Sequence, residues 1–449
     1  MSKRKIVPKR FLLSLIPLCF TLFLSGCLLK PVDELYTLPR QSDAYYNLQL
    51  EIEKVVTGSV QYCAPLSGEH RQPLQMQDLD GDGTDEAIVY ARDTDEKPLK
   101  MFIFSRSGDD FHLTSTIEGV GTNFDSVCYE QIDGSPGKEI LVGRSISDQL
   151  LKSVSIHSFQ GNSSVELMSA NYSAYETFDL DSDGRQDLFL IRFEAETQIG
   201  TVELYRYQDG VMARDPEQRL SDGVTSVRRV ITGFTEKDVP AVFVAGMLDE
   251  NLIRTDIFAL QDDVICNIVS DDGSGSMTVR NYNVYSDDID GDGIIELPEP
   301  FDIEKAPGSE DGTVYRLIQW YSLGLDGKKS YKMLTYHDYS RGFYVELDSA
   351  WKTDIAICRD DTVTEGQAYR FLQLNTKTNS SQEIFTIYVF SGDHRTELAT
   401  SDGRFLLAEK NDISFAASIG DSPWAKNLTE NDLMERFRFI SLDWNSGEM

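Results

Sequence analysis

Three short acidic segments combine the residue types and the spacing of a loop that binds a divalent cation. Each has carboxylates at positions 1, 3, 5 and 9 of a nine-residue run and glycine at position 6, and the runs are Asp78–Glu86, Asp179–Asp187 and Asp288–Glu296. Carboxylates at alternate positions of a tight loop can converge on one ion, and calcium takes about six to eight oxygen ligands. Glycine permits the sharp reversal because it enters left-handed conformations freely.

We therefore predict up to three structural calcium ions, one in each loop. Position 7 would offer its backbone carbonyl, which leaves its side chain free to vary. The expected ligand residues are, in chain order, Asp78, Asp80, Asp82, Thr84, Glu86, Asp179, Asp181, Asp183, Arg185, Asp187, Asp288, Asp290, Asp292, Ile294 and Glu296. Without metal these carboxylates repel one another at short range, so calcium should stabilise the surrounding structure.

Two other interpretations apply to the same residues. A single Asp/Gly segment could be a turn exposed to solvent, but three copies at a matched step favour calcium. Asp288 to Glu299 also fits the spacing of an EF-hand loop with glutamate at position 12. The other two loops have Val89 and Leu190 at that position, and Pro298 and Pro300 oppose a helix leaving the loop. We therefore interpret Glu299 as a coincidence.

The acidic loops belong to a repeat. Weaker copies at Gln131–Glu139 and Gly233–Pro240 stand between them, which gives a step of about 50 residues. In each unit a strand-like run, such as Phe124–Tyr129, Val227–Ile231 or Tyr282–Tyr285, precedes the loop, and further strand-like runs follow. Four short strands in about 50 residues is the size of one propeller blade. The chain is predicted to be mainly β, with a β-propeller of about five four-stranded blades.

Residues 70–338 resemble the FG-GAP/VCBS repeats of integrin-like propellers. The resemblance rests on the Asp-x-Asp-x-Asp-Gly loops followed by hydrophobic strands. It implies that the loop positions given above are calcium ligands and that calcium braces the blades. It also implies that partners bind on the opposite face or on the rim. Two of the three loops have glutamate at position 9, which is one methylene longer than aspartate.

The first residues have the layout of an export signal. Five basic residues within 1–10 precede an apolar run from Phe11 to Leu24, which is too short to span a bilayer. The run ends at Leu24-Ser25-Gly26-Cys27, which resembles the lipobox of bacterial lipoprotein precursors. That resemblance implies cleavage before Cys27 and lipid on its sulfur. We expect a signal peptide over 1–26, a tether over 27–42, and an extracytoplasmic location on a bacterial membrane.

The regions that flank the repeat have different patterns. Apolar residues at helical spacing predict a helix over 43–57, within an N-terminal lead-in of 43–69. Residues 339–449 are predicted to form a small α+β domain, with a helix from Asn427 to Phe437 that Thr429 could cap. The alternative is that the first strands of this region extend the propeller by one or two blades.

Charge and cysteine content narrow the choice of partners. The net charge is −32, and loss of the five basic residues of the signal brings it near −37. This excess of acidic groups argues against nucleic acid and against basic docking on anionic lipid. Cys63, Cys128, Cys266 and Cys358 would remain besides Cys27, in no CxxC pair. Disulfides are permitted outside the cell, and buried thiols are the other interpretation.

No catalytic motif is recognisable in the sequence. The five histidines form no HExxH pattern, and GxSxG and Walker motifs are missing. We therefore predict a non-enzymatic, membrane-anchored binding or scaffold lipoprotein that presents a surface to a protein or glycan. The alternative is a surface enzyme, or an accessory subunit, that acts on polysaccharide. Such an enzyme would need a cleft with paired carboxylates of raised pKa.

Overall fold

The computed structural model describes residues 43–440 except 147–150, 162, 195, 249–251, 270–276 and 308–312. The expected signal 1–26, the tether 27–42 and Cys27 therefore lie outside the described residues. Within these ranges the chain is mainly β, as predicted. No helix among the described residues has the length and apolar character needed to cross a membrane.

Six antiparallel sheets make up the described part of the chain, and we number them in chain order. Sheet 1 contains β1 (Gln61–Tyr62), β2 (Leu74–Gln77), β3 (Glu86–Arg92), β4 (Leu99–Ser107) and β5 (Asp110–Gly119). Sheet 2 contains β6 (Asn123–Glu130), β7 (Glu139–Ser145), β8 (Lys152–Gln160) and β9 (Ser163–Tyr172). Sheet 3 contains β10 (Ala174–Phe178), β11 (Asp187–Glu194), β12 (Ile199–Gln208), β13 (Val211–Arg214) and β14 (Gln218–Arg219).

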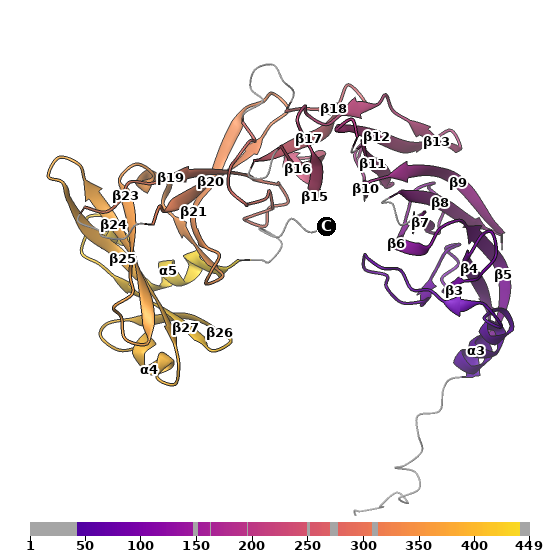
Figure 1. Cartoon of the computed structure of the whole chain (residues 1–449), viewed down its shortest axis with the longest axis horizontal. Coiled ribbons are helices and arrows are strands. Elements are labelled where there is room, and N and C mark those ends of the chain that lie inside the picture. Colours follow the sequence, from indigo (N-terminus) through magenta and orange to yellow (C-terminus); the bar gives the residue numbers. More distant parts are fainter. Residues whose placement is uncertain are drawn as a thin grey trace, which may run out of the picture.

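The second half of the chain continues the series. Sheet 4 contains β15 (Ser226–Glu236), β16 (Val239–Met247), β17 (Ile253–Gln261) and β18 (Val264–Asn267). Sheet 5 contains β19 (Leu297–Asp302), β20 (Arg316–Leu323), β21 (Lys329–Asp338), β22 (Phe343–Leu347) and β28 (Phe437–Phe439). Sheet 6 contains β23 (Ile355–Asp360), β24 (Gly366–Asn375), β25 (Ser380–Ser391), β26 (Phe405–Lys410) and β27 (Ile413–Ile419). Figure 1 shows the six sheets following one another along an open arc.

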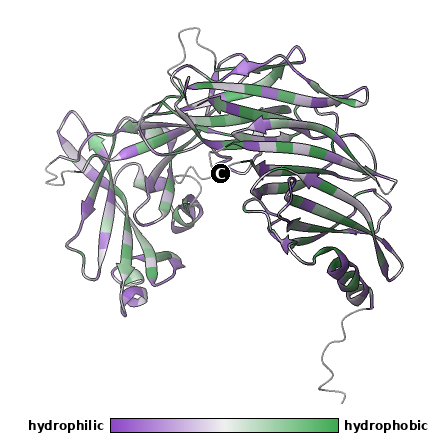
Figure 2. Cartoon of the chain, turned by 45° about the vertical axis from the view of Figure 1, so that its right-hand side comes forward, coloured by the Kyte–Doolittle hydropathy of each residue, from purple (hydrophilic) through white to green (hydrophobic). Residues whose placement is uncertain are grey.

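The apolar core is divided among the contacts between consecutive sheets. Each pair of consecutive sheets shares a cluster of buried apolar residues. Examples are Tyr90 and Ile140 for sheets 1 and 2, Ile156 and Leu188 for sheets 2 and 3, Phe189 and Phe258 for sheets 3 and 4, Phe243 and Leu297 for sheets 4 and 5, and Phe343 and Phe371 for sheets 5 and 6. An inner sheet is thus covered on both faces, which is why β16 and β17 each bury seven consecutive residues. Figure 2 shows the hydrophobic residues concentrated along the strands.

The helices lie at the two ends of the described chain. The predicted N-terminal helix is confirmed as α3 (Asp43–Val55), whose buried Leu48 and Ile52 pack against sheet 1. The other two are α4 (Arg395–Ala399) and α5 (Glu430–Arg436), with 3-10 turns at Ser349–Trp351 and Ala425–Asn427. The predicted cap of α5 is confirmed, because Thr429 and Asp432 form a reciprocal capping box.

One predicted strand does not form. Residues 282–285 belong to no strand, and only an isolated bridge between Asp287 and Glu296 stands where the first strand of sheet 5 was expected. The buried Arg280 donates from Nε to the carbonyl of Val284 at 2.5 Å. A side chain thus takes the hydrogen bond that a neighbouring strand would otherwise supply.

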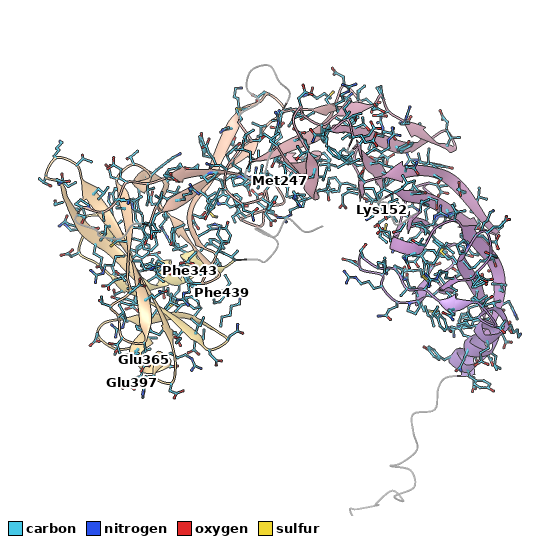
Figure 3. All side chains as sticks on the ribbon, viewed as in Figure 1. Lys152, Met247, Phe343, Glu365, Glu397 and Phe439 are labelled. Carbon is cyan, nitrogen blue, oxygen red and sulfur yellow. The ribbon has the colours of Figure 1, made fainter. Side chains whose placement is uncertain are left out.

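The predicted boundary between residues 338 and 339 is also wrong. It falls in the turn between β21 and β22, which pair with each other in sheet 5. The chain then returns from sheet 6 and adds β28 to the same sheet, where Phe439 lies opposite Phe343 (Figure 3). The region after 338 therefore supplies two strands to sheet 5 besides all of sheet 6. No local sequence pattern indicates that β22 pairs with β21 or that β28 returns to sheet 5.

None of the cysteines in the described ranges, Cys63, Cys128, Cys266 and Cys358, forms a disulfide. All four are half-buried. Burial raises the pKa of the Cys128 thiol to about 12, so this thiol stays protonated. The described cysteines are therefore free thiols, less buried than the second interpretation expected.

The contact between α3 and sheet 1 gives a first prediction. Leu48 is 2 % exposed, whereas Leu50 on the same helix is 41 % exposed. We expect Leu48→Ala to lower the free energy of unfolding by about 2–5 kcal/mol, because it removes buried methyl groups and leaves a cavity. Leu50→Ala is the matched control and should change it by less than about 0.5 kcal/mol. Urea unfolding of both variants measures the difference, and equal effects would contradict the packing of α3.

Candidate metal centres

Each acidic loop leads directly into a strand whose first residues are buried. The first loop joins β2 to β3, the second joins β10 to β11, and the third leads into β19. The glycine at position 6 has φ between +85° and +86° in all three, at Gly83, Gly184 and Gly293. An L side chain is strained at this φ, so the structure confirms why glycine stands there.

Backbone N–H groups hold the carboxylates in the same arrangement in the three loops. The position 1 carboxylate accepts from the N–H of the position 6 glycine at 2.9 Å in each loop. The position 3 carboxylate accepts from the N–H of position 5 at 3.2 Å. The position 5 carboxylate accepts from the N–H of position 7, at 2.7 Å from Thr84, 2.9 Å from Arg185 and 2.8 Å from Ile294. Position 7 thus acts through its backbone, which is consistent with its varied side chains.

Three carboxylates converge in each loop. Their oxygen atoms lie within 4.8 Å of one another in the clusters Asp78, Asp80 and Asp82; Asp179, Asp181 and Asp187; and Asp288, Asp290 and Glu296. Such clusters of oxygen ligands could hold a metal ion. The structure therefore brings together nine of the twelve predicted carboxylates, and leaves Glu86, Asp183 and Asp292 outside the clusters.

The position 9 carboxylate closes each loop from within. It accepts from the backbone N–H of position 2, where Glu86 binds Leu79 at 2.9 Å and Asp187 binds Leu180 at 3.0 Å. Glu296 binds Ile289 in the same way at 3.1 Å. Both aspartate and glutamate reach the N–H, so the extra methylene of glutamate does not break the pattern. This structural role was not part of the sequence prediction.

Burial raises the pKa of all three position 9 carboxyls. The pKa of Glu86 is raised to about 7, that of Asp187 to about 7, and that of Glu296 to about 8. The largest cause is desolvation, and the carboxylates at positions 3 and 5 add repulsion. A bound cation would offset both effects, because it stabilises the charged form.

Glu296 offers an oxygen with no partner. Its side chain is 0 % exposed, and Oε2 accepts the N–H of Ile289. Its Oε1 is buried and has no hydrogen-bond partner among the residues that the structure describes. A buried oxygen of this kind is costly unless something binds it. The chemistry of this donor set therefore fits a hard cation bound between Glu296, Asp288 and Asp290.

The charges around the three loops differ. Arg185 and Arg206 form ion pairs with Asp183 and Asp181 in the second loop, the latter at 3.6 Å. Lys332 of β21 contacts Asp292 in the third loop at 2.6 Å. In the described part of the chain no lysine or arginine forms an ion pair with the first loop. Arg206 and Lys332 stand 25 and 40 residues from their partners, so no local sequence signal reveals them.

In the weaker copy at Gln131–Glu139, a side-chain amide stands at position 1 where the acidic loops have a carboxylate. Glu139 still closes the loop by accepting the N–H of Ile132 at 2.8 Å. The Gln131 side chain takes position 1, where Oε1 accepts the N–H of Gly134 at 2.8 Å. Its Nε2 donates to the carbonyl of Ser135 and, at 3.2 Å, to that of Gly137. The amide group therefore donates to backbone oxygens at positions 5 and 7, so this loop is braced without metal.

This amide-braced loop touches the loops on both sides. The backbone N–H of Gln186 donates to the Gln131 carbonyl at 2.7 Å. On the other side, a Cβ added to Gly81 would come within 2.5 Å of Pro136, and one added to Gly137 would come within 2.0 Å of the Leu79 carbonyl. The loops of sheets 1, 2 and 3 thus form one continuous edge.

The other weak copy has no loop. β15 and β16 are joined by Lys237 and Asp238 alone, and Asp238 takes a left-handed φ of +58°. The acidic residues of Gly233–Pro240 therefore do not converge. Instead the backbone carbonyl of Phe234 accepts a hydrogen bond at 2.8 Å from the N–H of Ile295, which lies in the third loop.

The EF-hand alternative is wrong. Glu299 lies within β19, and that strand leaves the loop where an EF-hand would have a helix. Its carboxylate binds Lys329 at 2.6 Å. Position 9, and not position 12, therefore supplies the closing carboxylate of this loop.

Comparisons with known proteins give no family assignment. No family model matches the chain, and no curated protein matches it. Among solved structures, a protein from Lactobacillus plantarum is 10 % identical, with 70 % of this chain and 84 % of that chain covered and a TM-score of 0.25. The exotype rhamnogalacturonan lyase YesX is 11 % identical, with 74 % and 67 % covered and a TM-score of 0.29. The rhamnogalacturonan lyase YesW is 12 % identical, with 72 % of each chain covered and a TM-score of 0.29. At these scores the likenesses carry no argument about this chain.

The unpartnered oxygen of Glu296 gives a second prediction. In the full chain, Glu296→Gln should lower the number of bound calcium ions by about one, because an amide cannot supply the same charge to the ion. Glu299→Gln is the matched control, three residues away on β19, and should keep the wild-type number. Isothermal titration calorimetry with calcium measures both. Loss of an ion in the Glu299 variant alone would reinstate the EF-hand coordination.

The raised pKa values give a third prediction. The pKa of Glu296 is about 8 in the folded protein, against an ordinary value of 4.5. Between these two pH values the metal-free folded protein keeps the Glu296 proton, whereas the unfolded chain has released it. Stability of the metal-free form should therefore fall as pH rises through this window. Calcium affinity should rise over the same window, by about tenfold per pH unit at this loop, because binding needs the carboxylate. Calcium titrations between pH 6 and 8 test this, and an affinity independent of pH would contradict it.

Proposed function

We propose that this chain is a lipid-anchored extracytoplasmic binding protein, whose propeller-like series of sheets is braced by calcium and presents a surface to a protein or glycan. The observation that carries the proposal is the set of three loops with one hydrogen-bond pattern and converging carboxylates. Loops of this kind hold calcium where the ion is plentiful, and extracellular modules commonly bind it at about 0.1–1 mM. A location outside the cytoplasm would supply such concentrations.

The anchoring half of the proposal rests on the sequence before residue 43. Leu24-Ser25-Gly26-Cys27 follows a basic and then apolar segment, and the motif fits lipid attachment at Cys27. Two acyl chains on one residue give stable membrane binding, whereas one gives marginal binding. The net charge of −32 makes attraction to anionic lipid an unsuitable alternative. Residues 27–42 would then act as a tether between the membrane and α3.

The binding half rests on the form of the molecule. The six sheets expose loop edges and outer strands along an arc, and the acidic loops are engaged in holding strands together. Metal used in this way stabilises a scaffold and leaves the remaining edges for partners. Polysaccharide cleavage is the competing function. The length of the polysaccharide after incubation distinguishes the two functions. A binding protein leaves the polysaccharide at its original length, so shorter chains in size-exclusion chromatography would contradict our proposal.

Lipid anchoring gives a fourth prediction. In a bacterial host that processes lipoproteins, Cys27→Ala should move the full chain from the membrane fraction to the soluble fraction, because no acyl chain can be attached. Cys19→Ala, within the apolar segment, is the matched control and should leave the protein on the membrane. Fractionation followed by immunoblotting measures both. Complete retention of the Cys27 variant on the membrane would overturn the anchoring.

A further inference from the structure

A lysine holds one oxygen of the third acidic loop. Asp292 stands at position 5 of that loop, and its Oδ1 accepts the backbone N–H of Ile294 at 2.8 Å. Its Oδ2 accepts a hydrogen bond from Nζ of Lys332 at 2.6 Å. Both oxygens of position 5 therefore have a donor, and a calcium ion that binds here must take the place of the ammonium group.

The same position is free in the first loop. Asp82 Oδ1 accepts the N–H of Thr84 at 2.7 Å, and its Oδ2 accepts no hydrogen bond from the described part of the chain. Asp82 lies among the converging carboxylates of its loop, whereas Asp292 does not. In the second loop Oδ2 of Asp183 accepts from Nε of Arg185 at 2.8 Å, and Asp183 is also outside its cluster. Position 5 thus joins the cluster only in the loop where no basic side chain holds it.

A β-bulge in β21 directs Lys332 toward the loop. Met333 lies opposite Trp320 of β20. The next pair is Tyr331 with Tyr321, which leaves Lys332 as an extra residue without a partner on β20. A bulge bends its strand locally and can re-aim a side chain. The approach of the lysine to a loop 40 residues earlier therefore has a cause in the strand itself.

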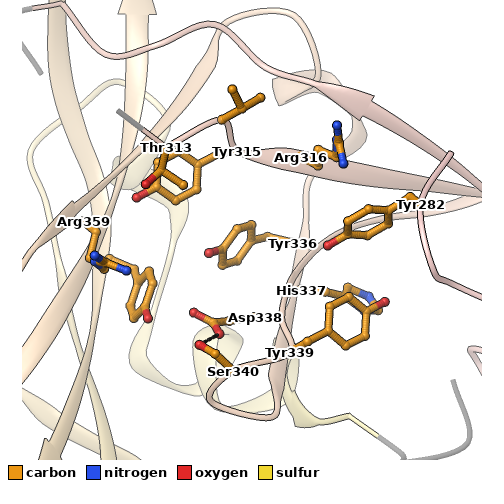
Figure 4. A pocket seen from close by; sticks show the side chains of 12 residues that line it. Tyr282, Thr313, Tyr315, Arg316, Tyr336, His337, Asp338, Tyr339, Ser340 and Arg359 are labelled. Carbon is orange, nitrogen blue, oxygen red and sulfur yellow. Dashed lines mark hydrogen bonds between the residues drawn. The ribbon is translucent and has the colours of Figure 1, made fainter. Parts of the chain in front are cut away.

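The rest of β21 is a fixed support for Lys332, because both of its faces are packed. On the face toward sheet 6, the Tyr336 ring lies 5.4 Å from the Phe371 ring. On the opposite face, the His337 ring lies 5.1 Å from the Tyr344 ring. Figure 4 shows Tyr336 and His337 pointing to opposite sides of the strand. The place of Lys332 is therefore set by the core of sheet 5, and not by the loop.

Lys332 does not complete the third site. It donates to Asp292 alone among the described residues, and the other three carboxylates of the loop converge without it. Oε1 of Glu296 is buried and has no hydrogen-bond partner within the described ranges. The lysine thus differs from the Gln131 amide, which donates to two backbone oxygens of its own loop. A divalent ion still has a set of oxygen ligands here.

The charge of Lys332 acts on the whole cluster. Its hydrogen bond to Asp292 raises the pKa of Lys332, and the charges of Asp290 and Glu296 raise it further. The ammonium group therefore stays charged at neutral pH, and it repels a calcium ion that enters the loop. Because the lysine side chain is 26 % exposed, water and salt weaken this repulsion, so its effect on affinity is modest.

We propose that Lys332 is an internal competitor of calcium at the third loop and sets the affinity of that loop. Calcium must displace the ammonium group from Asp292 before position 5 can bind the ion. The first loop has no basic partner of this kind in the described ranges, so it fills at a lower calcium concentration. The third loop then still responds to calcium after the first is filled. The inference rests on the calcium bracing of the proposed function, and it names the residue that regulates one of its sites.

The fifth prediction removes the charge of Lys332. Isothermal titration calorimetry of the full chain with calcium gives the affinities, and the binding event that is missing in Glu296→Gln belongs to the third loop. In Lys332→Met the dissociation constant of this event should fall about three- to tenfold, because the ion pair no longer opposes calcium. In the double variant with Glu296→Gln, this gain in affinity should disappear.

The first loop supplies an internal reference. The binding event that is missing in Asp80→Asn belongs to the first loop. In the wild type its dissociation constant should be lower than that of the third loop, and Lys332→Met should leave it unchanged. A first loop that binds calcium more weakly than the third would contradict the proposed order of filling.

Two variants control for charge and for folding. Lys332→Arg keeps a positive charge and N–H donors, so the third loop should keep its wild-type affinity. Lys328→Met removes the same charge from the turn before β21, where Lys328 pairs with Asp326, and should also leave that affinity unchanged. The rise in melting temperature caused by calcium should be larger in Lys332→Met than in the wild type. Loss of a purely structural ion pair would instead lower the melting temperature equally with and without calcium.

Three results would overturn the inference. The first is an unchanged third-loop dissociation constant in Lys332→Met, and the second is an equal gain in affinity in Lys332→Arg. The third is a wild-type protein that binds two ions and gains one in Lys332→Met, because the lysine would then replace calcium instead of competing with it. The first two results, with three ions bound in the wild type, refute this inference alone. Absence of calcium binding from the wild type and every variant would refute the calcium bracing itself, and this inference with it.

Discussion

One hydrogen bond between a side-chain carboxylate and a backbone N–H recurs along the arc. In four loops the carboxylate at position 9 accepts the N–H of position 2, over 2.8–3.1 Å. The carboxylate stands at or next to the start of a strand whose first residues are buried, so the bond ties the entry of the loop to the core. In the three acidic loops, the glycine at position 6 reverses the chain, and the carboxylates at positions 1 and 3 are turned toward the same point. The bond is present whether or not the loop carries a full set of acidic residues.

This arrangement places carboxyl groups where water is largely excluded. Glu86, Asp187 and Glu296 are each at most 4 % exposed, and desolvation raises their pKa. A backbone N–H offsets part of that cost, because it is a neutral donor. Arg206 and Lys332 add positive charge at the second and third loops only. The three loops therefore share one geometry and differ in their electrostatic surroundings.

The elements that were predicted correctly are those whose signals are local. The loops, the position 6 glycines and α3 could be read from residue type and spacing, because each depends on its own few residues. The missing strand at 282–285 could not, since the side chain of Arg280 binds the Val284 carbonyl. The boundary at 338 was wrong because β28 returns to sheet 5 over about ninety residues of chain. Arg206 and Lys332 reach the acidic loops from 25 and 40 residues away, and no single segment contains that pattern.

The amide of Gln131 has a consequence for how the arc responds to its surroundings. A side-chain amide is part of the chain and does not depend on the composition of the medium, whereas an ion is exchanged with it. The loop at Gln131–Glu139 lies between the first two acidic loops and touches both. With calcium bound as we propose, a chelator would loosen the first two acidic loops and leave the loop between them unchanged. Loss of calcium from one acidic loop would then leave the other acidic loop in place, because the hydrogen-bonded loop at Gln131–Glu139 lies between them.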